Sequence, residues 1–109
     1  MEKEPLDCLM KCLEKLRGLD SDMPLAQAMC LLLIAKHEGL SLKELAEKAG
    51  IGMASASRYV AFFGKPHAGL GHKPGMGLVM ATEDPLERRK KTITLTGKGR
   101  NVIKQLGGV

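Results

Sequence analysis

The stretch GKPHAGLGHKPGMG at residues 64–77 limits how this chain can fold more than any other feature of its sequence. It holds five glycines and two prolines. Because proline lacks an amide donor and glycine is costly to order, neither a helix nor a central strand is expected here. We predict a long, flexible connection, which makes the distance between the segments on its two sides adjustable.

The segment before this connection has apolar residues at helical spacing. An N-terminal helix within residues 1–19 carries leucines at three- and four-residue steps, which form one apolar stripe. Residues 26–34 are apolar nearly all round, so we expect a buried central helix, capped by a side chain from residues 20–22. The stripe can serve either a dimer contact or the core of the chain itself. It consists of Leu6, Leu9, Leu13 and Leu16.

Residues 41–63 contain two helices in close succession, joined by a short turn. Ser41 and Glu44 fit a capping box, in which a hydroxyl and a carboxylate bond the free amides at a helix start. The first helix is expected to end near Ala49, where Gly50 suits a turn, and Ala46 is small enough for a close helix crossing. A support helix, a tight turn and a second helix are the parts of a helix-turn-helix.

The second helix of this pair is expected to bury one side and to expose the other. Ala56, Val60 and Phe63 recur at helical spacing and form the buried side. The major groove of DNA admits one helix, where an arginine can bind guanine or a phosphate and serine hydroxyls can bond bases or phosphates. The side chains expected to face outward, fully or in part, are Met53, Ser55, Ser57, Arg58 and Phe62.

After the connection, the pattern changes from helix to strand. Residues 78–95 predict a β-hairpin, with strands at 78–83 and 91–95. Thr96 can cap a last helix over residues 96–106. Aromatic residues make up only 3% of the chain, so aliphatic side chains must build the core, which suits packed helices. The whole chain is predicted to be one domain, mainly α with a small β-hairpin wing, of the winged helix-turn-helix class.

Basic charge is concentrated in the C-terminal half. Residues 1–54 carry 7 positive and 9 negative charges, a net of −2, whereas residues 55–109 carry 10 and 3, a net of +7. Such an asymmetry is expected where one face meets a polyanion. Arg88, Arg89 and Lys90 lie at the hairpin tip, and the negative potential of a minor groove attracts arginines on a narrow protrusion. We therefore predict double-stranded DNA as a partner.

Several short motifs occur in order along about residues 23–106. They are Ser41-Leu42-Lys43-Glu44-Leu45-Ala46, Gly50-Ile51, Ser55-Ala56-Ser57-Arg58, Gly77-Leu78-Val79, Asp84-Pro85-x-Glu87-Arg88-Arg89 and Leu95-Thr96-x-Lys98-Gly99. Together they resemble the MarR family of winged-helix regulators. The resemblance implies a homodimer on a palindromic operator, usually acting as a repressor. It also implies that Asp84 supports the wing and that Arg88 and Arg89 approach the DNA backbone or the minor groove.

The sequence departs from this family pattern in two places. The connection at residues 64–77 is longer than the family's direct link from helix to wing, and the sequence ends after the helix at 96–106. Typical members use a long C-terminal helix to dimerise, so dimerisation here would rest on the helix within residues 1–19, with or without the last helix. No small-molecule effector can be named. The candidate DNA-binding residues are Met53, Ser55, Ser57, Arg58, Lys65, Arg88, Arg89 and Lys90.

No constellation of residues predicts an enzyme, a metal site or a cofactor. No nucleophile, base and orienting partner can be assembled, and His67 and His72 lack further ligands at a defined spacing. Cys8 and Cys12 stand four residues apart on one helix, a geometry that opposes a disulfide, and Cys30 is expected in the core. Unpaired cysteines and the lack of a long apolar stretch predict a cytoplasmic protein without a membrane partner.

Three functions fit these features, and the first is our prediction. It is a sequence-specific transcriptional regulator, acting as a repressor and a homodimer. One alternative is a winged helix used as a protein–protein interaction module, in which Arg58, Arg88 and Arg89 are replaceable without loss of DNA affinity. The other is a nonspecific nucleic-acid-binding component of a replication or packaging complex, with a steep salt dependence but little preference among sequences.

Overall fold

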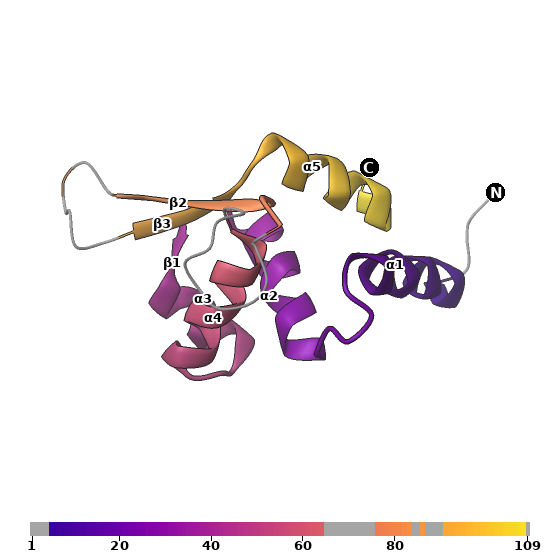
Figure 1. Ribbon diagram of the computed structural model, residues 1–109, viewed down its shortest axis with the longest axis horizontal. Helices are drawn as coiled ribbons and strands as arrows, with labels where there is room; N and C mark the ends of the chain where they lie inside the picture. Colours follow the sequence, from indigo (N-terminus) through magenta and orange to yellow (C-terminus); the bar gives the residue numbers. More distant parts are fainter. Residues whose placement is uncertain (1–4, 65–75, 84–85, 87–90, 109) are drawn as a thin grey trace.

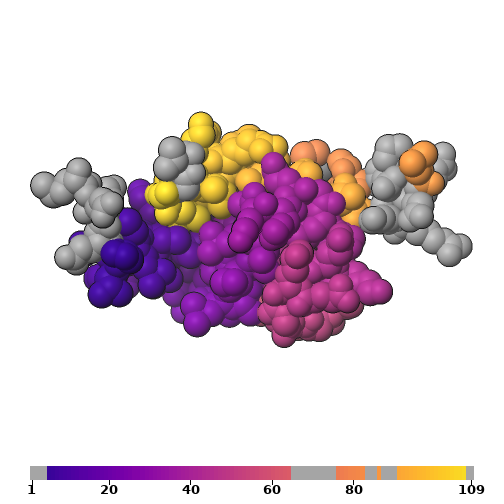
Figure 2. All heavy atoms as spheres, turned by 180° about the vertical axis from the view of Figure 1, so that it is seen from behind, coloured from indigo at the N-terminus to yellow at the C-terminus, as the bar shows by residue number. Residues whose placement is uncertain are grey.

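The computed structural model describes residues 5–64, 76–83, 86 and 91–108 (Figure 1). Helices make up most of it, and a small three-stranded antiparallel sheet packs against them. The predicted class, mainly helical with a small β-hairpin wing, is confirmed. Helix α1 (Pro5–Leu19) lies at one end of the molecule, and the hairpin points toward the other. Figure 2 shows the same two ends from behind, with α1 in indigo and the described part of the wing in orange.

The first two helices differ in how much of their apolar surface is buried. α1 buries only Leu16 of its leucine stripe and packs against the C-terminal end of the chain. α2 (Leu25–Lys36) lies in the centre, as its all-round apolar sequence predicts, and contacts α3, α4, α5 and β3. Within the described residues, no helix is long and apolar enough to cross a membrane. The side chains that α2 buries completely are Cys30, Leu31 and Ile34.

The predicted cap of α2 is wrong. Pro24 occupies the cap position, and no side chain bonds the first amides of the helix. The Asp20 carboxylate instead accepts a hydrogen bond from the Asp22 amide at 3.1 Å, within the turn before the helix. Proline fits a helix start because its backbone angle is preset and its missing amide leaves no donor unsatisfied there.

Two short helices form the helix-turn-helix, α3 (Leu42–Ala49) and α4 (Met53–Phe63). The capping box is confirmed: the Ser41 hydroxyl accepts from the Glu44 amide at 3.1 Å, and the Glu44 carboxylate accepts from the Ser41 amide at 2.8 Å. Gly50 ends α3 at a φ of 70°, a left-handed conformation that glycine adopts without strain. The turn that sets α4 against α3 therefore depends on this glycine.

The sheet has the order β1-β3-β2, with both pairs antiparallel. β2 (Val79–Glu83) and β3 (Lys91–Leu95) are the predicted hairpin strands, and Ala81 pairs with Ile93 near their middle. β1 (Leu40–Ser41) was not predicted, because two residues between helices show no alternation that could be recognised. It attaches the hairpin to the start of α3.

The chain ends in α5 (Gly97–Ile103), which continues into a wider helical turn, η2 (Lys104–Gly108). The predicted cap is confirmed, since the Thr96 hydroxyl accepts from the Gly99 amide at 3.0 Å. η2 is the segment against which α1 packs. The two ends of the described chain therefore support each other at one end of the molecule (Figure 1).

The predicted adjustable distance between α4 and the wing is wrong. The carbonyl of Phe62 accepts a hydrogen bond from the Met76 amide at 3.0 Å, and that of Phe63 accepts from the Leu78 amide at 2.8 Å. Residues 65–75 lie outside the described part of the chain. The two hydrogen bonds link residues on either side of the connection. They therefore join the end of α4 directly to the start of β2.

A second set of bonds joins the wing to α5. The Leu78 carbonyl accepts from the Thr96 amide at 2.9 Å, and the Thr96 hydroxyl donates to the Gly77 carbonyl at 2.7 Å. Gly99 packs so closely on this junction that a Cβ atom at its position would overlap the Leu78 carbonyl group. The start of β2 is therefore held from both sides, by α4 and by α5.

Glu38 adds a bridge from the end of α2 to the end of the wing. Its carboxylate accepts from the Leu95 amide at 2.9 Å and from the Arg100 guanidinium at 2.8 Å. The hydrogen bond from Arg100, followed by the one from Leu95, lowers the pKa of the Glu38 carboxyl below its ordinary value. This bridge was not predicted because its partners are 57 and 62 residues away in the sequence.

Candidate nucleic-acid interface

Helix α4 exposes most of the side chains that were predicted to face outward. Met53, Ser57 and Arg58 are exposed, and Ser55 is half-buried at the flank of the helix. Ala54 was not predicted and is exposed as well. It lies three and four residues before Ser57 and Arg58, so these three side chains form one ridge. The methyl group of Ala54 in this ridge can contact the methyl group of thymine. An alanine in a sequence gives no indication of such a role.

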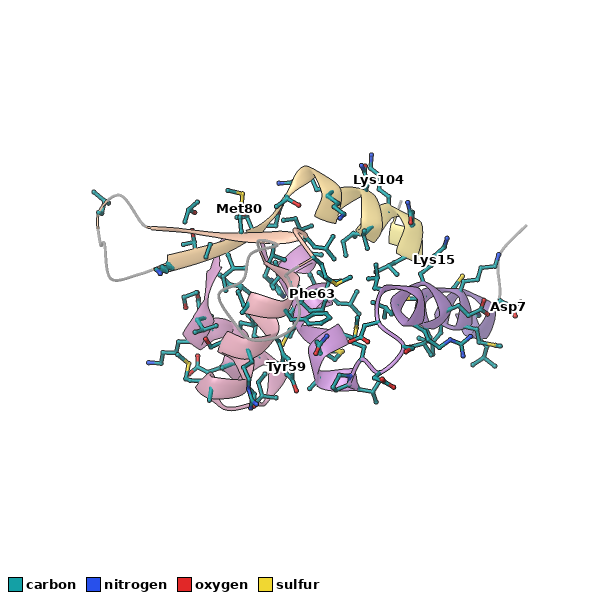
Figure 3. All side chains as sticks on the ribbon, in the orientation of Figure 1. Asp7, Lys15, Tyr59, Phe63, Met80 and Lys104 are labelled. Atoms are coloured by element: carbon teal, nitrogen blue, oxygen red, sulfur yellow. The ribbon has the colours of Figure 1, made fainter. Side chains whose placement is uncertain are left out.

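The opposite side of α4 fixes the orientation of this ridge. Ala56 and Phe63 are completely buried, as predicted, whereas Val60 is only half-buried. Phe63 points into the centre of the molecule (Figure 3). The ring of Phe62 stacks edge-on against that of Phe63, with 5.3 Å between ring centroids, and is partly buried. Two phenylalanines at the end of α4 therefore hold the helix against the core.

Five of the predicted site residues lie outside the described part of the chain. They are Lys65, Asp84, Arg88, Arg89 and Lys90. The structure does describe the strands that lead to and from the wing tip, and these strands extend beyond the helices (Figure 1). A contact of these five residues with DNA, or a supporting role of Asp84 in the wing, stays a prediction.

The sheet places one further basic residue beside α4. Lys91, Ile93 and Leu95 alternate along β3 and therefore share one face of the sheet. Ile93 and Leu95 are buried in the core, whereas Lys91, at the end of β3 nearest the wing tip, is exposed. From the sequence, Lys91 was predicted only as the first residue of a strand. The alternation of Lys91 with the apolar residues Ile93 and Leu95 could have indicated that its side chain shares their face of the sheet.

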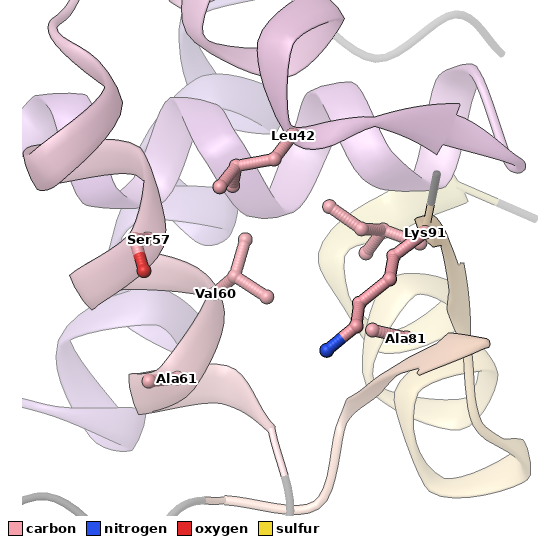
Figure 4. Close-up of a pocket in the computed structure, with 7 residues that line it drawn as sticks. Leu42, Ser57, Val60, Ala61, Ala81 and Lys91 are labelled. Carbon is pink, nitrogen blue, oxygen red and sulfur yellow. The ribbon is translucent and has the colours of Figure 1, made fainter. Parts of the chain in front are cut away.

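A cleft of about 410 Å³ separates α4 from the strands of the wing (Figure 4). Lys91 extends from β3 into this cleft, and Ala81 of β2 lines the same side. The Ser57 hydroxyl lies on the opposite wall. The remaining lining residues are apolar, and they are Leu42, Val60, Ala61 and Ile93. The interface candidate thus combines a ridge on α4, a projecting hairpin and a cleft with a positive charge between them.

The other end of the molecule exposes most of the leucine stripe of α1. Leu6 is 69% exposed and Leu13 is 45% exposed, and both Leu9 and Met10 are exposed as well. A shallow groove of about 340 Å³ runs along this face past Glu14 and Arg17. Within the described chain, the stripe is therefore core only at Leu16 and is otherwise free for a contact with another molecule.

The cysteines show no sign of a reactive site. Cys30 is buried as predicted, and burial raises the pKa of its thiol, which disfavours the reactive thiolate. Cys8 is exposed, Cys12 is partly buried, and both are free thiols. No group of three or more histidine, cysteine or acidic side chains lies together among the described residues.

The fold is similar to those of solved MarR-family regulators. No protein-family model matches the sequence, and no curated protein is significantly similar to it. The S. aureus MepR–DNA complex superposes with a TM-score of 0.71 at 18% identity, over 94% of this chain and 74% of that one. The transcriptional repressor CouR, bound to a 23-mer DNA duplex, gives a TM-score of 0.64 at 24% identity, over 94% and 63% of the two chains.

MarR itself superposes with a TM-score of 0.61 at 22% identity, over 93% of this chain and 72% of MarR. The resemblance to the MarR family that the motifs indicated is thereby confirmed at the level of the fold. Of these three proteins, CouR is a transcriptional repressor, and both CouR and MepR were solved with DNA. This chain spans only about two thirds to three quarters of their length.

Proposed function

We propose that this chain is a transcriptional repressor that binds double-stranded DNA at specific sequences. The observation that carries the proposal is the exposed ridge of α4 beside a projecting hairpin, with a core that fixes the two relative to each other. Two proteins of the same fold, MepR and CouR, have been solved with DNA. The net charge of +7 in residues 55–109 supplies the attraction to a polyanion.

In the proposed complex, the first half of α4 lies in the major groove. Arg58 is long enough to bind guanine through two hydrogen bonds or to hold a phosphate, and Ser57 bonds a base edge or a phosphate beside it. Ala54 and Met53 supply apolar contact at the start of the helix. Ser55 contributes from the flank, where it is half-buried.

The wing would enter the adjacent minor groove. Arg88, Arg89 and Lys90 follow β2 in the sequence and precede β3, so they belong to the hairpin that extends beyond the helices. A narrow minor groove has an enhanced negative potential that favours arginine. Asp84 would support this tip, and Lys65, directly after α4, would add a phosphate contact.

A second copy of the chain is the proposed partner of α1. The face with Leu6, Leu9 and Leu13 is apolar, exposed and far from α4, so it can pair two copies without covering the ridge (Figure 1). A dimer with twofold symmetry would set two α4 helices about one turn of DNA apart and would therefore recognise a palindromic site.

The test is to select bound sequences from random duplex DNA and then to measure affinity against salt concentration. We expect an enriched palindrome. We also expect Arg58→Ala to cost about 1 to 3 kcal/mol and to relax specificity at one base position, whereas Arg88→Ala weakens all sites evenly. Lys104→Ala is the matched control, because it removes the same charge from an exposed residue far from α4 (Figure 3).

Three other outcomes would each contradict part of this proposal. Binding with a steep salt dependence but no enriched sequence would indicate a nonspecific nucleic-acid-binding protein. Arginine substitutions without effect on DNA affinity would favour a protein–protein interaction module. No detectable binding of the wild-type chain at low salt would overturn the proposal as a whole.

A further inference from the structure

The inner face of the sheet changes character along the hairpin. Near its root the face is core, with Val79 and Ile93 almost completely buried. Farther toward the wing tip the same face opens at Ala81 and Lys91, which are exposed. The cleft between α4 and the wing is the space above this open part (Figure 4). The cleft therefore has a mostly apolar lining that adjoins the core, and the ammonium group of Lys91 lies at its opening.

The path of bound DNA across this cleft follows from groove geometry. Neighbouring major and minor grooves are separated by one phosphodiester backbone, so a protein with a helix in one and a hairpin in the other must let that backbone pass between them. We propose that the cleft between α4 and the wing receives this backbone, and that the Lys91 ammonium group binds one of its phosphates. This inference rests on the proposed function.

Lys91 is suited to this role because it is exposed at the mouth of the cleft, where its cross-strand partner is Glu83. The described residues that line the cleft include no carboxylate. A lysine ammonium binds phosphate as a point charge.

Ser57 gives the cleft a second donor on its opposite wall. Ser57 lines the cleft from α4, and in Figure 4 Val60 lies between it and Lys91. A phosphate between them would be bound from both sides, and α4 and the wing would be positioned together on one strand. Phosphate contacts fix the position of a protein along the duplex without distinguishing base sequences. Lys91 is therefore a positioning residue, whereas Arg58 is a residue that recognises bases.

The first test compares Lys91→Ala with Lys104→Ala on the DNA site selected by the wild-type chain. We expect Lys91→Ala to lower affinity about threefold to tenfold and to reduce the slope of log affinity against log salt by about 0.9, the value for one phosphate. The preferred sequence should not change, Lys91→Arg should restore the slope, and Lys104→Ala should match the wild type. Equal behaviour of Lys91→Ala and Lys104→Ala would overturn the inference while leaving the proposed function intact.

The second test finds the phosphate. Single phosphates of the selected site are replaced by neutral methylphosphonates, and each duplex is titrated with the wild type and with Lys91→Ala. We expect a methylphosphonate at one position, between the base pairs read by α4 and the minor groove that the wing enters, to lower the DNA affinity of the wild type. The same substitution should not lower the affinity of Lys91→Ala any further. Additive losses at every position would refute the contact, and a wild-type chain that binds no DNA would instead refute the proposed function. Because Lys91 is exposed, the variant should unfold at the wild-type temperature, which circular dichroism checks.

Discussion

Replacing Gly99 with alanine tests whether the wing is held to the helices at one packed junction. A Cβ atom at this position would overlap the carbonyl oxygen of Leu78 and approach its carbonyl carbon and Cα. These are backbone atoms, so no rotamer change can relieve the overlap. Leu78 cannot move alone either, because its amide bonds Phe63 and its carbonyl bonds Thr96. Either α5 or the wing has to shift.

The expected cost follows from what such a shift breaks. Overpacking of a buried site costs about 1 to 3 kcal/mol. Displacing α5 also weakens the Thr96 cap and the bond from the Thr96 amide to Leu78, each worth about 1 kcal/mol. Alanine returns about 1 kcal/mol through its better helix propensity. We therefore expect Gly99→Ala to lower the free energy of unfolding by about 2 to 4 kcal/mol, which lowers the unfolding temperature by about 10 to 20 °C.

Urea unfolding followed by circular dichroism measures this change, and the same helix offers a matched control. Gly97 begins α5 with open space around its Cβ position. Gly97→Ala should therefore be neutral or stabilising by about 0.5 kcal/mol. If the two variants unfold within about 0.5 kcal/mol of each other, the close packing of Gly99 on Leu78 does not hold the wing, and the reasoning fails.

Two further predictions follow from charges and exposed surface. The lowered pKa of Glu38 means that its bridge to Arg100 is fully present above the ordinary carboxyl pKa and is lost as pH falls through the lowered value. Glu38→Gln should thus cost about 1 kcal/mol at pH 7 and nothing near pH 2 in urea unfolding, and an equal cost at both would contradict the bridge. On α1, the double variant Leu9→Gln, Leu13→Gln should convert a dimer to a monomer in sedimentation, whereas Leu25→Gln, an exposed leucine elsewhere, should not. A wild-type chain that sediments as a monomer at all concentrations would refute the proposed α1 interface.

Local features of the fold were predictable because their causes are local. The bonds between Ser41 and Glu44 and between Thr96 and Gly99 join residues three positions apart, so their sequence pattern is sufficient. The same holds for α4, whose exposed and buried sides follow from helical spacing alone. The helix-turn-helix and the hairpin strands were found for this reason.

Features that depend on distant partners were missed. Strand β1 exists only because β3 lies beside it, and Glu38 is important only because Leu95 and Arg100 reach its carboxylate. Lys91 belongs to the candidate site only through the position of β3 beside α4. A single sequence shows the composition of such residues but not the packing that brings their partners to them.

In the connection at residues 64–77, the number of residues and the distance between α4 and β2 are independent of each other. Closing a flexible loop costs free energy that grows slowly with its length, about 0.6 kcal/mol for each doubling. The hydrogen bonds that the Met76 and Leu78 amides donate to the carbonyls of Phe62 and Phe63 fix where the two ends lie. The number of residues between these ends therefore changes stability slightly and does not change the distance from α4 to β2. In the proposed complex, α4 and the wing would meet neighbouring grooves as a fixed pair, so their spacing on DNA depends on these bonds rather than on the glycine-rich stretch.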